Sequence, residues 1–304
     1  MTVIAEPPMP ENVIAKHEAG QLTQTGLAGS LEQLVIEHQH CTARVSLYGG
    51  HVLAWQPKGE QEVFWLSKSP SYQAGKAIRG GVPLCWPWFG GWLGTQPEAA
   101  KAGNHGFART VLWQLANHVI DDKSVTIELV WQGSQQHPVW PYHAKVTQKL
   151  KFGQTFEQQF IVENLASEAF EFTGALHSYF AVSSPAQVTA PALDNVLFDC
   201  KLTGNQQQRE VLSNLVGPLD RIYHSQAEMA LIDTGFGRVI RIAPQNVKQW
   251  VLWNPGQAVA QGMADVHQGG EQEYVCLEAA NTQWLTVEAG QSLSFGQVIS
   301  VAPL

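Results

Sequence analysis

Cysteine is scarce in this sequence. Its 304 residues contain four cysteines, and these lie far apart: Cys41, Cys85, Cys200 and Cys276. No two of them form a CxxC pair, so the spacing indicates no disulfide framework, and reduced, buried thiols are expected. Neither Cys85 nor Cys276 has a base beside it in the sequence. Because buried thiols are usually inert, a cysteine nucleophile is disfavoured.

Excess positive charge and long apolar runs are lacking as well. Lys and Arg number 18 against 26 Asp and Glu, and this acidic balance argues against nucleic acid and an anionic membrane as partners. No apolar run approaches the ~18 residues of a membrane span, and no signal peptide is recognisable. We therefore expect a cytoplasmic protein. A small anionic ligand is compatible with the composition, because local arginines decide its binding.

Helical periodicity is sparse, whereas alternation of apolar and polar residues recurs from about residue 31 onward. Residues 125–131, 146–152 and 156–162 follow this pattern to different degrees, and residues 249–253 are expected to form another strand. Turn residues separate such segments at regular spacing. With 44% hydrophobic residues, the chain can bury a sizeable core. The pattern predicts an all-β protein, a large antiparallel β-sandwich.

The domain organisation is expected to be simple. No internal repeat, charge block or low-complexity linker marks a boundary, so residues 21–304 are predicted to form a single β-sandwich domain. Residues 1–20 contain several prolines among polar neighbours and are expected to form a loose lead-in. Short helices are predicted only at residues 206–215 and 265–274.

One segment has neither helical nor strand periodicity. Residues 78–90 and 104–109 combine glycines and large aromatic residues with Arg79, His105 and Arg109. Ordering so much glycine costs backbone entropy, which suggests that the segment builds a site. Aromatic faces beside guanidinium groups suit a ligand with apolar C–H faces and an anionic group, such as a sugar phosphate. The alternative is a pair of turns with arginines in surface ion pairs.

Two titratable residues stand next to apolar runs. His177 follows Ala175 and Leu176 at the expected end of a strand, and Glu278 follows Val275, Cys276 and Leu277. His177 suits a general acid or base, because the ordinary histidine pKa of about 6.5 lies near working pH. The alternatives are a hydrogen-bonded core histidine and an exposed glutamate at the rim. Sequence alone does not bring the two residues together.

Other polar residues give weaker signals. Asp220 follows an expected turn at residues 217–218, where it would orient a ligand hydroxyl or cap the turn. Residues 253–256, WNPG, are typical of a turn after a strand. His38 and His40 lack further ligands at metal-binding spacing, so no metal site is predicted. No phosphate-binding P-loop or dinucleotide fingerprint is present.

Six motifs occur in a characteristic order between residues 78 and 279. In order they read RGGVPLCWPWFG, NHGFAR, ALHSYF, DRIY, WNPG and VCLEA. This order resembles the hexose-6-phosphate 1-epimerases, the phosphosugar branch of the aldose 1-epimerase (galactose mutarotase-like) proteins. The first two motifs are the specific part of the resemblance. It implies a large β-sandwich with a site on its concave face.

The resemblance also implies residue roles. His177 matches the general acid and Glu278 the general base of the family. Arg79 and His105 match positions that line the sugar site, with Arg79 a candidate to share the phosphate. Arg109 matches a phosphate-binding arginine of the family. Asp220 matches a residue that contacts sugar hydroxyls. A third basic phosphate ligand is not identifiable from the motifs.

The implied reaction interconverts the α and β anomers of a hexose 6-phosphate, with D-glucose 6-phosphate the expected substrate. Glu278 takes the proton of the anomeric hydroxyl while His177 gives one to the ring oxygen, and the opened ring recloses on the other face. This scheme expects a normal or lowered carboxylate pKa and a histidine pKa at or above neutrality. It requires no cofactor, and we expect a monomer acting on a small sugar phosphate.

The sequence departs from the family pattern at two places. Trp88 stands where family members often have a small or polar residue at the pocket rim. Ala279 and Ala280 replace Pro-Gly-like residues expected in a loop after the glutamate. The alternatives to a phosphosugar epimerase are a non-catalytic carbohydrate-binding module, an aldose 1-epimerase of free sugars, and a structural β-protein.

Overall fold

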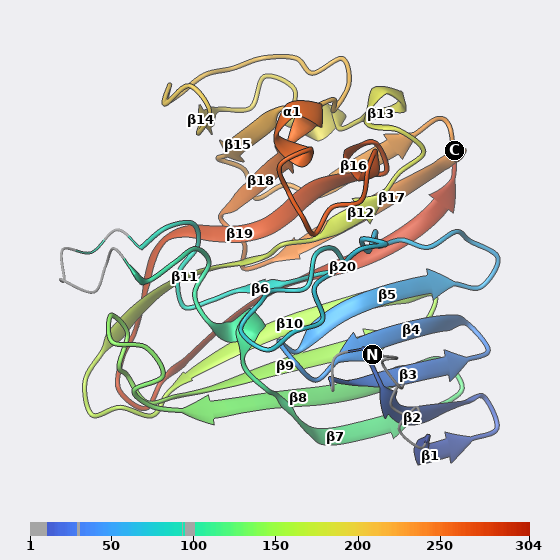
Figure 1. Cartoon of the computed structure of the whole chain (residues 1–304), viewed down its shortest axis with the longest axis vertical. Helices are drawn as coiled ribbons and strands as arrows, with labels where there is room; N and C mark the ends of the chain where they lie inside the picture. The colour runs from blue at the N-terminus through green and yellow to red at the C-terminus, as the bar shows by residue number, and fades with distance from the viewer. Residues whose placement is uncertain (1–10, 29–30, 93, 95–100) are drawn as a thin grey trace, which may run out of the picture.

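A computed structural model describes residues 11–28, 31–92, 94 and 101–304 of the chain, and their strands form three antiparallel sheets (Figure 1). The first sheet is a five-stranded meander in which each strand pairs with the next along the chain. Its strands are β1 (Asn12–His17), β2 (Gly20–Gly26), β3 (Glu32–His38), β4 (Cys41–Ser46) and β5 (His51–Pro57).

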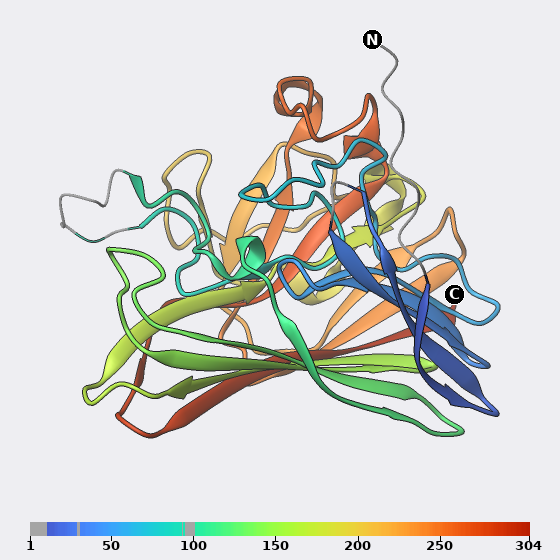
Figure 2. The ribbon, with the colours of Figure 1, turned by 60° about the horizontal axis from the view of Figure 1, so that its bottom comes forward.

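The second sheet has eight strands and forms the long layer that crosses the lower part of Figure 2. Its order is β13 (Val188–Thr189), β16 (Met229–Asp233), β17 (Arg238–Gln245), β20 (Ser292–Pro303), β10 (Thr155–Asn164), β9 (Ala144–Phe152), β8 (Val125–Gly133) and β7 (Gln114–Ile120). Burial alternates strictly along most of β8 and β10, which confirms the strands predicted from periodicity.

The third sheet has seven strands and carries the residues of interest. Its order is β14 (Phe198–Cys200), β15 (Leu219–Tyr223), β18 (Gln249–Asn254), β19 (Tyr274–Val287), β11 (Phe170–Leu176) and β6 (Leu84–Cys85), while β12 (Tyr179–Ala181) also pairs with β19. Helical segments are short: α1 (Gly256–Ala260), η2 (Ala108–Thr110), η3 (Pro185–Gln187), η4 (Pro191–Leu193) and η5 (Gly270–Gln272). Among the described residues, no helix is long and apolar enough to cross a membrane.

Both predicted helices are wrong in detail. Residues 206–215 contain no helix, because their backbone bonds to a distant segment. The backbone N–H of Asn195 donates to the carbonyl oxygen of Glu210, and Phe198 and Gln208 exchange two backbone hydrogen bonds. In residues 265–274 only the 3₁₀ turn Gly270–Gln272 is helical, and it follows Gly269 in the left-handed region. The short helix α1 was not predicted.

The predicted loose lead-in is also wrong where it can be examined. Residues 12–17 form β1 and pair with β2, which begins at Gly20. Residues 1–10 lie outside the described residues. Backbone pairing with the next strand orders a segment whose own composition is typical of a loose terminus.

A ladder of buried glutamines joins the second sheet to the third. Gln148 donates to the carbonyl oxygen of Gly50 and accepts from Gln158, whose side chain accepts from Gln297 at 2.9 Å. Gln297 also bonds to Ser178 Oγ at 2.9 Å. Each glutamine is at most 1% exposed, so these bonds satisfy amides that would otherwise be costly to bury. Ser178 directly follows His177, and the ladder therefore fixes the backbone at that point.

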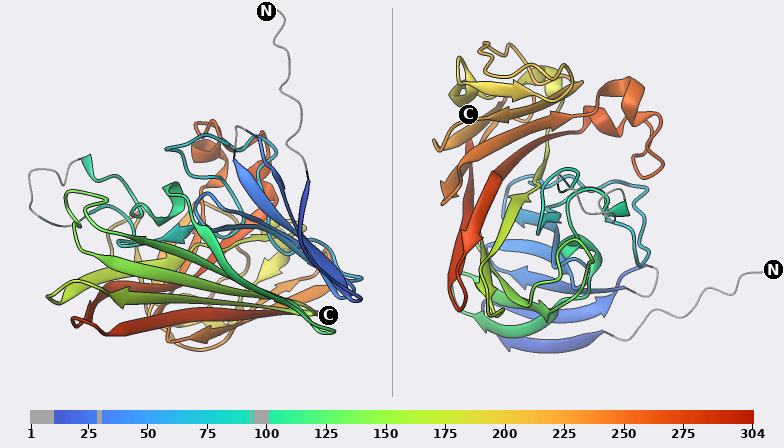
Figure 3. Two further views of the ribbon diagram at one scale, coloured as in Figure 1. Left: turned by 90° about the horizontal axis from the view of Figure 1, so that it is seen from below. Right: turned by 90° about the vertical axis from the view of Figure 1, so that its left-hand side faces the viewer.

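Figure 3 shows that loops cover one face of the third sheet. In its right-hand view, α1 and the teal loops between β5 and β7 project from the same side of β18 and β19. Apart from β6, residues 78–90 and 104–109 of the glycine- and aromatic-rich segment belong to these loops. This arrangement brings the segment over one face of the third sheet, while the other face packs into the core.

Candidate active site

His177 and Glu278 face each other across neighbouring strands. The pairings of β11 and of β12 with β19 share one register, which sets His177 opposite Glu278. Side chains directly opposite in antiparallel strands share a face and have Cβ atoms roughly 4.5–5.5 Å apart. Accordingly, His177 Nε2 lies 3.4 Å from Glu278 Oε1. His177 is 8% exposed and Glu278 1% exposed, so the two form a buried pair in the middle of a sheet.

The same register adds aromatic and acidic side chains to this face. Asp220 on β15 lies opposite Trp253 on β18, and Val251 lies opposite Glu278. The His177 ring stacks on Tyr179, with centroids 4.8 Å apart and planes 9° apart. This packing holds the imidazole in one orientation beside the carboxylate.

Arg79 and His105 reach the site on loops that pass very close to other backbone segments. Gly81 (φ +62°) and Gly106 (φ +64°) both have left-handed backbone conformations, and an added Cβ at Gly106 would collide with the carbonyl of Trp86. At Gly81 it would collide with a carbonyl in β5. Only glycine fits both the conformation and the space. The motif glycines thus place the neighbouring arginine and histidine.

A cavity of about 280 Å³ lies between these loops and the sheet face. All six residues singled out from the sequence line it: Arg79, His105, Arg109, His177, Asp220 and Glu278. Its volume is near the lower end of the range for small-molecule pockets, which suits a ligand of monosaccharide size. The structure therefore brings the six together, and their chemical roles stay predictions.

In the ligand-free pair, the pKa values of both side chains are shifted in the direction opposite to the one expected from the sequence. Burial, and then the charge of Asp220, raise the pKa of Glu278 well above its ordinary value. Burial, followed by His105 and Arg109, lowers the pKa of His177 well below its ordinary value. The expectation of a histidine pKa at or above neutrality is therefore wrong for the empty site. Both shifts favour the uncharged forms of the two side chains, so in the empty site a shared proton is favoured on the Glu278 carboxyl group over the imidazole.

Two atoms of the pair are left for a ligand. Nδ1 of His177 and Oε2 of Glu278 are buried and have no hydrogen-bond partner among the described residues. A buried polar atom without a partner costs roughly 1–3 kcal/mol. Such atoms in the wall of a cavity are well suited to bonding the hydroxyl and ring oxygens of a sugar.

Comparisons with known proteins show which family the chain belongs to. A family model described as Aldose 1-epimerase matches residues 32–300. The chain belongs to the aldose 1-epimerase family. The protein is thus an epimerase, an enzyme that interconverts the two anomers of an aldose.

Individual relatives cover almost the whole enzyme. A protein of Escherichia coli strain K12 named "Putative glucose-6-phosphate 1-epimerase" is 35% identical over 284 residues, covering 90% of this chain and 91% of the relative. A crystal structure of "a putative mutarotase" from Salmonella typhimurium has a TM-score of 0.84 and 31% identity, and 97% of each chain is covered. A galactose mutarotase-like protein from Clostridium acetobutylicum, at 13% identity and a TM-score of 0.72, shares the fold.

Sequence reasoning missed half of the cavity wall of this epimerase. The residues not singled out as ligands are Phe89, Asn104, Lys201, Val251, Trp253 and Met263. Asn104 and Phe89 belong to the motifs that were recognised, and strand register would have placed Val251 and Trp253. Lys201 lies in a turn after β14, outside every motif, and no sequence signal pointed to it.

Several other sequence expectations are settled by burial. Trp88 is 1% exposed and Trp86 fully buried, so both fill the core of the epimerase, and Trp88 does not form the pocket rim. No loop follows Glu278, because β19 continues through Ala279 and Ala280 to Val287. Burial raises the pKa of Cys276 well above its ordinary value, as expected for an inert thiol.

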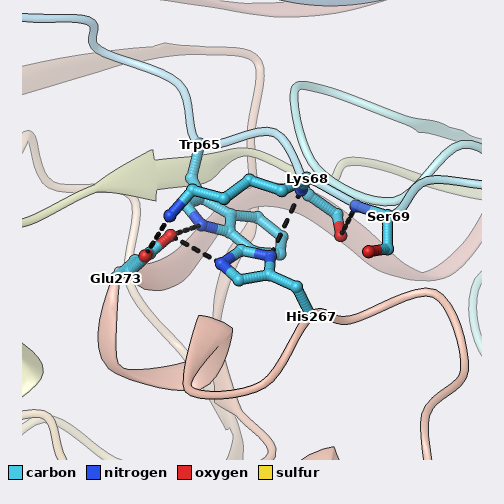
Figure 4. A network of polar contacts seen from close by, with 6 residues as sticks. Trp65, Lys68, Ser69, His267 and Glu273 are labelled. Carbon is cyan, nitrogen blue, oxygen red and sulfur yellow. Dashed lines mark hydrogen bonds and ion pairs between the residues drawn. The ribbon is translucent and has the colours of Figure 1, made fainter.

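Arg79 is held by an acidic loop of the enzyme. Its Nε lies 3.0 Å from Asp265 Oδ2, and its Nη1 donates to the Tyr179 hydroxyl at 2.8 Å. His267 follows Asp265 by two residues, and Figure 4 shows His267 and Lys68 both bonded to Glu273. Glu273 pairs with Lys68 at 2.6 Å and contacts His267 Nε2 at 3.0 Å. One carboxylate thus ties two loops together over the sheet.

Proposed function

We propose that this epimerase interconverts the α and β anomers of a hexose 6-phosphate, with D-glucose 6-phosphate as the preferred substrate. The observation that carries the proposal is the cavity itself, in which the buried pair His177–Glu278 is combined with cationic side chains, Arg109 among them. An acid–base pair suffices to open and close a sugar ring, and a guanidinium group suits a phosphate. The name of the Escherichia coli relative agrees with this substrate class.

The pair would act through one shared proton. In the active tautomer, Glu278 is the carboxylate and His177 the imidazolium, which requires a proton shift across the 3.4 Å contact between them. Glu278 then accepts the proton of the anomeric hydroxyl while His177 gives its proton to the ring oxygen. The C1–O5 bond breaks and the free aldehyde forms. Rotation about C1–C2 and closure on the other carbonyl face reverse both transfers.

A bound phosphate would favour this sequence electrostatically. The Arg109 and Arg79 charges are among the causes that lower the pKa of His177. A phosphate dianion bound by Arg109 offsets part of that charge and raises the pKa of the imidazole. Binding the correct substrate would therefore make the acid easier to protonate. Asp220, whose pKa is raised by burial, is proposed to contact sugar hydroxyls, and His105 to line the sugar site.

We also propose a cytoplasmic location, because all four cysteines are free thiols, which suits a reducing compartment. The substrate assignment is tested by magnetisation-transfer NMR of anomer exchange, with glucose 6-phosphate and glucose compared in wild-type enzyme and Arg109→Met. Wild-type enzyme should have the higher kcat/KM for the phosphosugar, and the substitution should reduce that preference. Equal acceleration of both sugars by the wild type would instead identify an epimerase of free aldoses.

A further inference from the structure

The cavity holds a cationic side chain that no motif predicts. Lys201 lies in the turn after β14, and its backbone N–H donates to the carbonyl oxygen of Asp220 at 2.8 Å. Its ammonium nitrogen lies 5.3 Å from the centroid of the Phe89 ring. Phe89 in turn meets His105 edge to face at 5.1 Å. These contacts place the lysine at the wall formed by the motif loop, on the side of the cavity where β15 begins.

Arg79 is poorly suited to the phosphate by comparison. Its guanidinium already bonds Asp265 and the Tyr179 hydroxyl, so its charge is compensated by an adjacent carboxylate. A phosphate dianion placed there would be repelled by Asp265. Lys201 has no acidic partner within 4.0 Å among the described residues. Its charge acts on the Asp220 carboxyl group across the cavity wall without forming an ion pair, and burial raises the pKa of that carboxyl group. Lys201 therefore offers a cation with no carboxylate bound to it.

Arg109 is available in the same way. The bond given for its guanidinium is from Nη2 to the carbonyl oxygen of Asn104 at 2.8 Å, and a guanidinium has five N–H donors. Burial, followed by the positive charges of Arg109 and Lys201, lowers the pKa of His105 to about 3. Both charges also lower the pKa of Glu278, against the larger effect of burial. Arg109 and Lys201 both line the cavity, from separate loops, where Arg109 bonds to Asn104 and Lys201 lies over Phe89.

We propose that Lys201 is the second cationic ligand of the substrate phosphate, acting with Arg109, and that it determines the preference for phosphorylated over free sugars. Arg79 is then a positioning residue that holds Asp265 and the loop above the site. This inference rests on the proposed function, because it presumes a phosphorylated substrate. The lysine is exposed, so water screens its charge, and one charge-assisted bond corresponds to roughly a 10-fold effect on affinity.

The test compares Lys201→Met with Lys201→Arg, using Lys123→Met as the matched control. Lys123 is an exposed lysine in the turn before β8, away from the cavity. Anomer exchange of glucose 6-phosphate and of glucose is measured by magnetisation-transfer NMR over a range of substrate concentrations. The Ki of inorganic phosphate against glucose 6-phosphate is measured for each variant.

Lys201→Met should lower the ratio of kcat/KM for glucose 6-phosphate over glucose roughly 10-fold, chiefly through KM. The Ki of inorganic phosphate should rise by a similar factor. Lys201→Arg should keep both the kcat/KM ratio and the phosphate Ki close to their wild-type values. Lys123→Met should match the wild type in both. Thermal melting of each variant checks that the fold is retained.

The outcomes separate the two proposals. If wild-type enzyme prefers the phosphosugar and Lys201→Met leaves the ratio and the phosphate Ki unchanged, the role of Lys201 is refuted and the proposed function stands. If wild-type enzyme shows no preference for the phosphosugar, the proposed function fails, and the phosphate ligand role of Lys201 fails with it.

Discussion

Replacing Glu278 with glutamine should stabilise the fold while removing the catalytic base. The carboxyl group is 1% exposed, and its Oε2 has no partner among the described residues. Burial is the main reason that its pKa is raised well above the ordinary value of 4.5. A glutamine has nearly the same shape and carries no charge at any pH. The substitution therefore removes the loss in free energy of unfolding that this buried carboxyl group causes above its ordinary pKa.

The sign and slope of the effect follow from proton linkage. Between the ordinary pKa and the raised pKa, the unfolded chain has released this proton and the folded chain still holds it. The free energy of unfolding then falls as pH rises, by about 1.4 kcal/mol for each pH unit from this one group. Glu278→Gln lacks this loss. The free energy of unfolding of Glu278→Gln should begin to exceed that of the wild type near pH 4.5. The difference should grow with pH until the pKa of Glu278 in the folded protein is passed.

Urea unfolding of both proteins at several pH values between 5 and 9 measures this difference. Glu288→Gln, at an exposed glutamate in the turn before β20, is the matched control and should differ from the wild type by less than about 0.5 kcal/mol. A Glu278→Gln protein that is no more stable than the wild type, with a difference independent of pH, would refute the reasoning about the buried pair.

Three further substitutions test the architecture around the site. Gly81→Ala should lower the free energy of unfolding by about 2–4 kcal/mol in urea titrations, because it adds strain and a backbone collision; an unchanged midpoint would contradict the close approach. Gln297→Leu should cost about 2–5 kcal/mol, since it removes hydrogen-bond partners of Gln158 and Ser178; a more stable variant would show that the ladder is dispensable. Trp253→Leu should lower kcat/KM roughly 10- to 100-fold by removing the ring edge that meets His177 at 5.9 Å; wild-type exchange kinetics would refute a positioning role.

Much of the fold could be predicted because strand periodicity is a local signal. The alternating apolar residues of β8 and β10 face the core as expected. Non-local pairing explains the errors. Residues 206–215 bond to residues 194–199 instead of forming a helix, and β1 is ordered by β2. Neither partner segment can be recognised from local composition.

Only part of the candidate site could be predicted from the sequence. The resemblance identified residues that do line one cavity, such as His177 and Glu278. It did not identify Lys201, which reaches the cavity from a turn without a motif. It also misjudged the pKa shifts of the pair, because burial on a sheet face is the main cause of both shifts and favours the uncharged forms. The direction of a pKa shift depends on burial, which sequence patterns describe only coarsely.

The central claim is that His177 and Glu278 act as one acid–base unit in sugar ring opening. It is tested by anomer exchange of glucose 6-phosphate at saturating concentration in His177→Gln, Glu278→Gln and the double variant. Each single substitution should reduce kcat by ~10²–10⁴-fold, and the double variant should lose little more than the worse single variant. Near-wild-type exchange by either single variant, with the fold intact, would contradict the account.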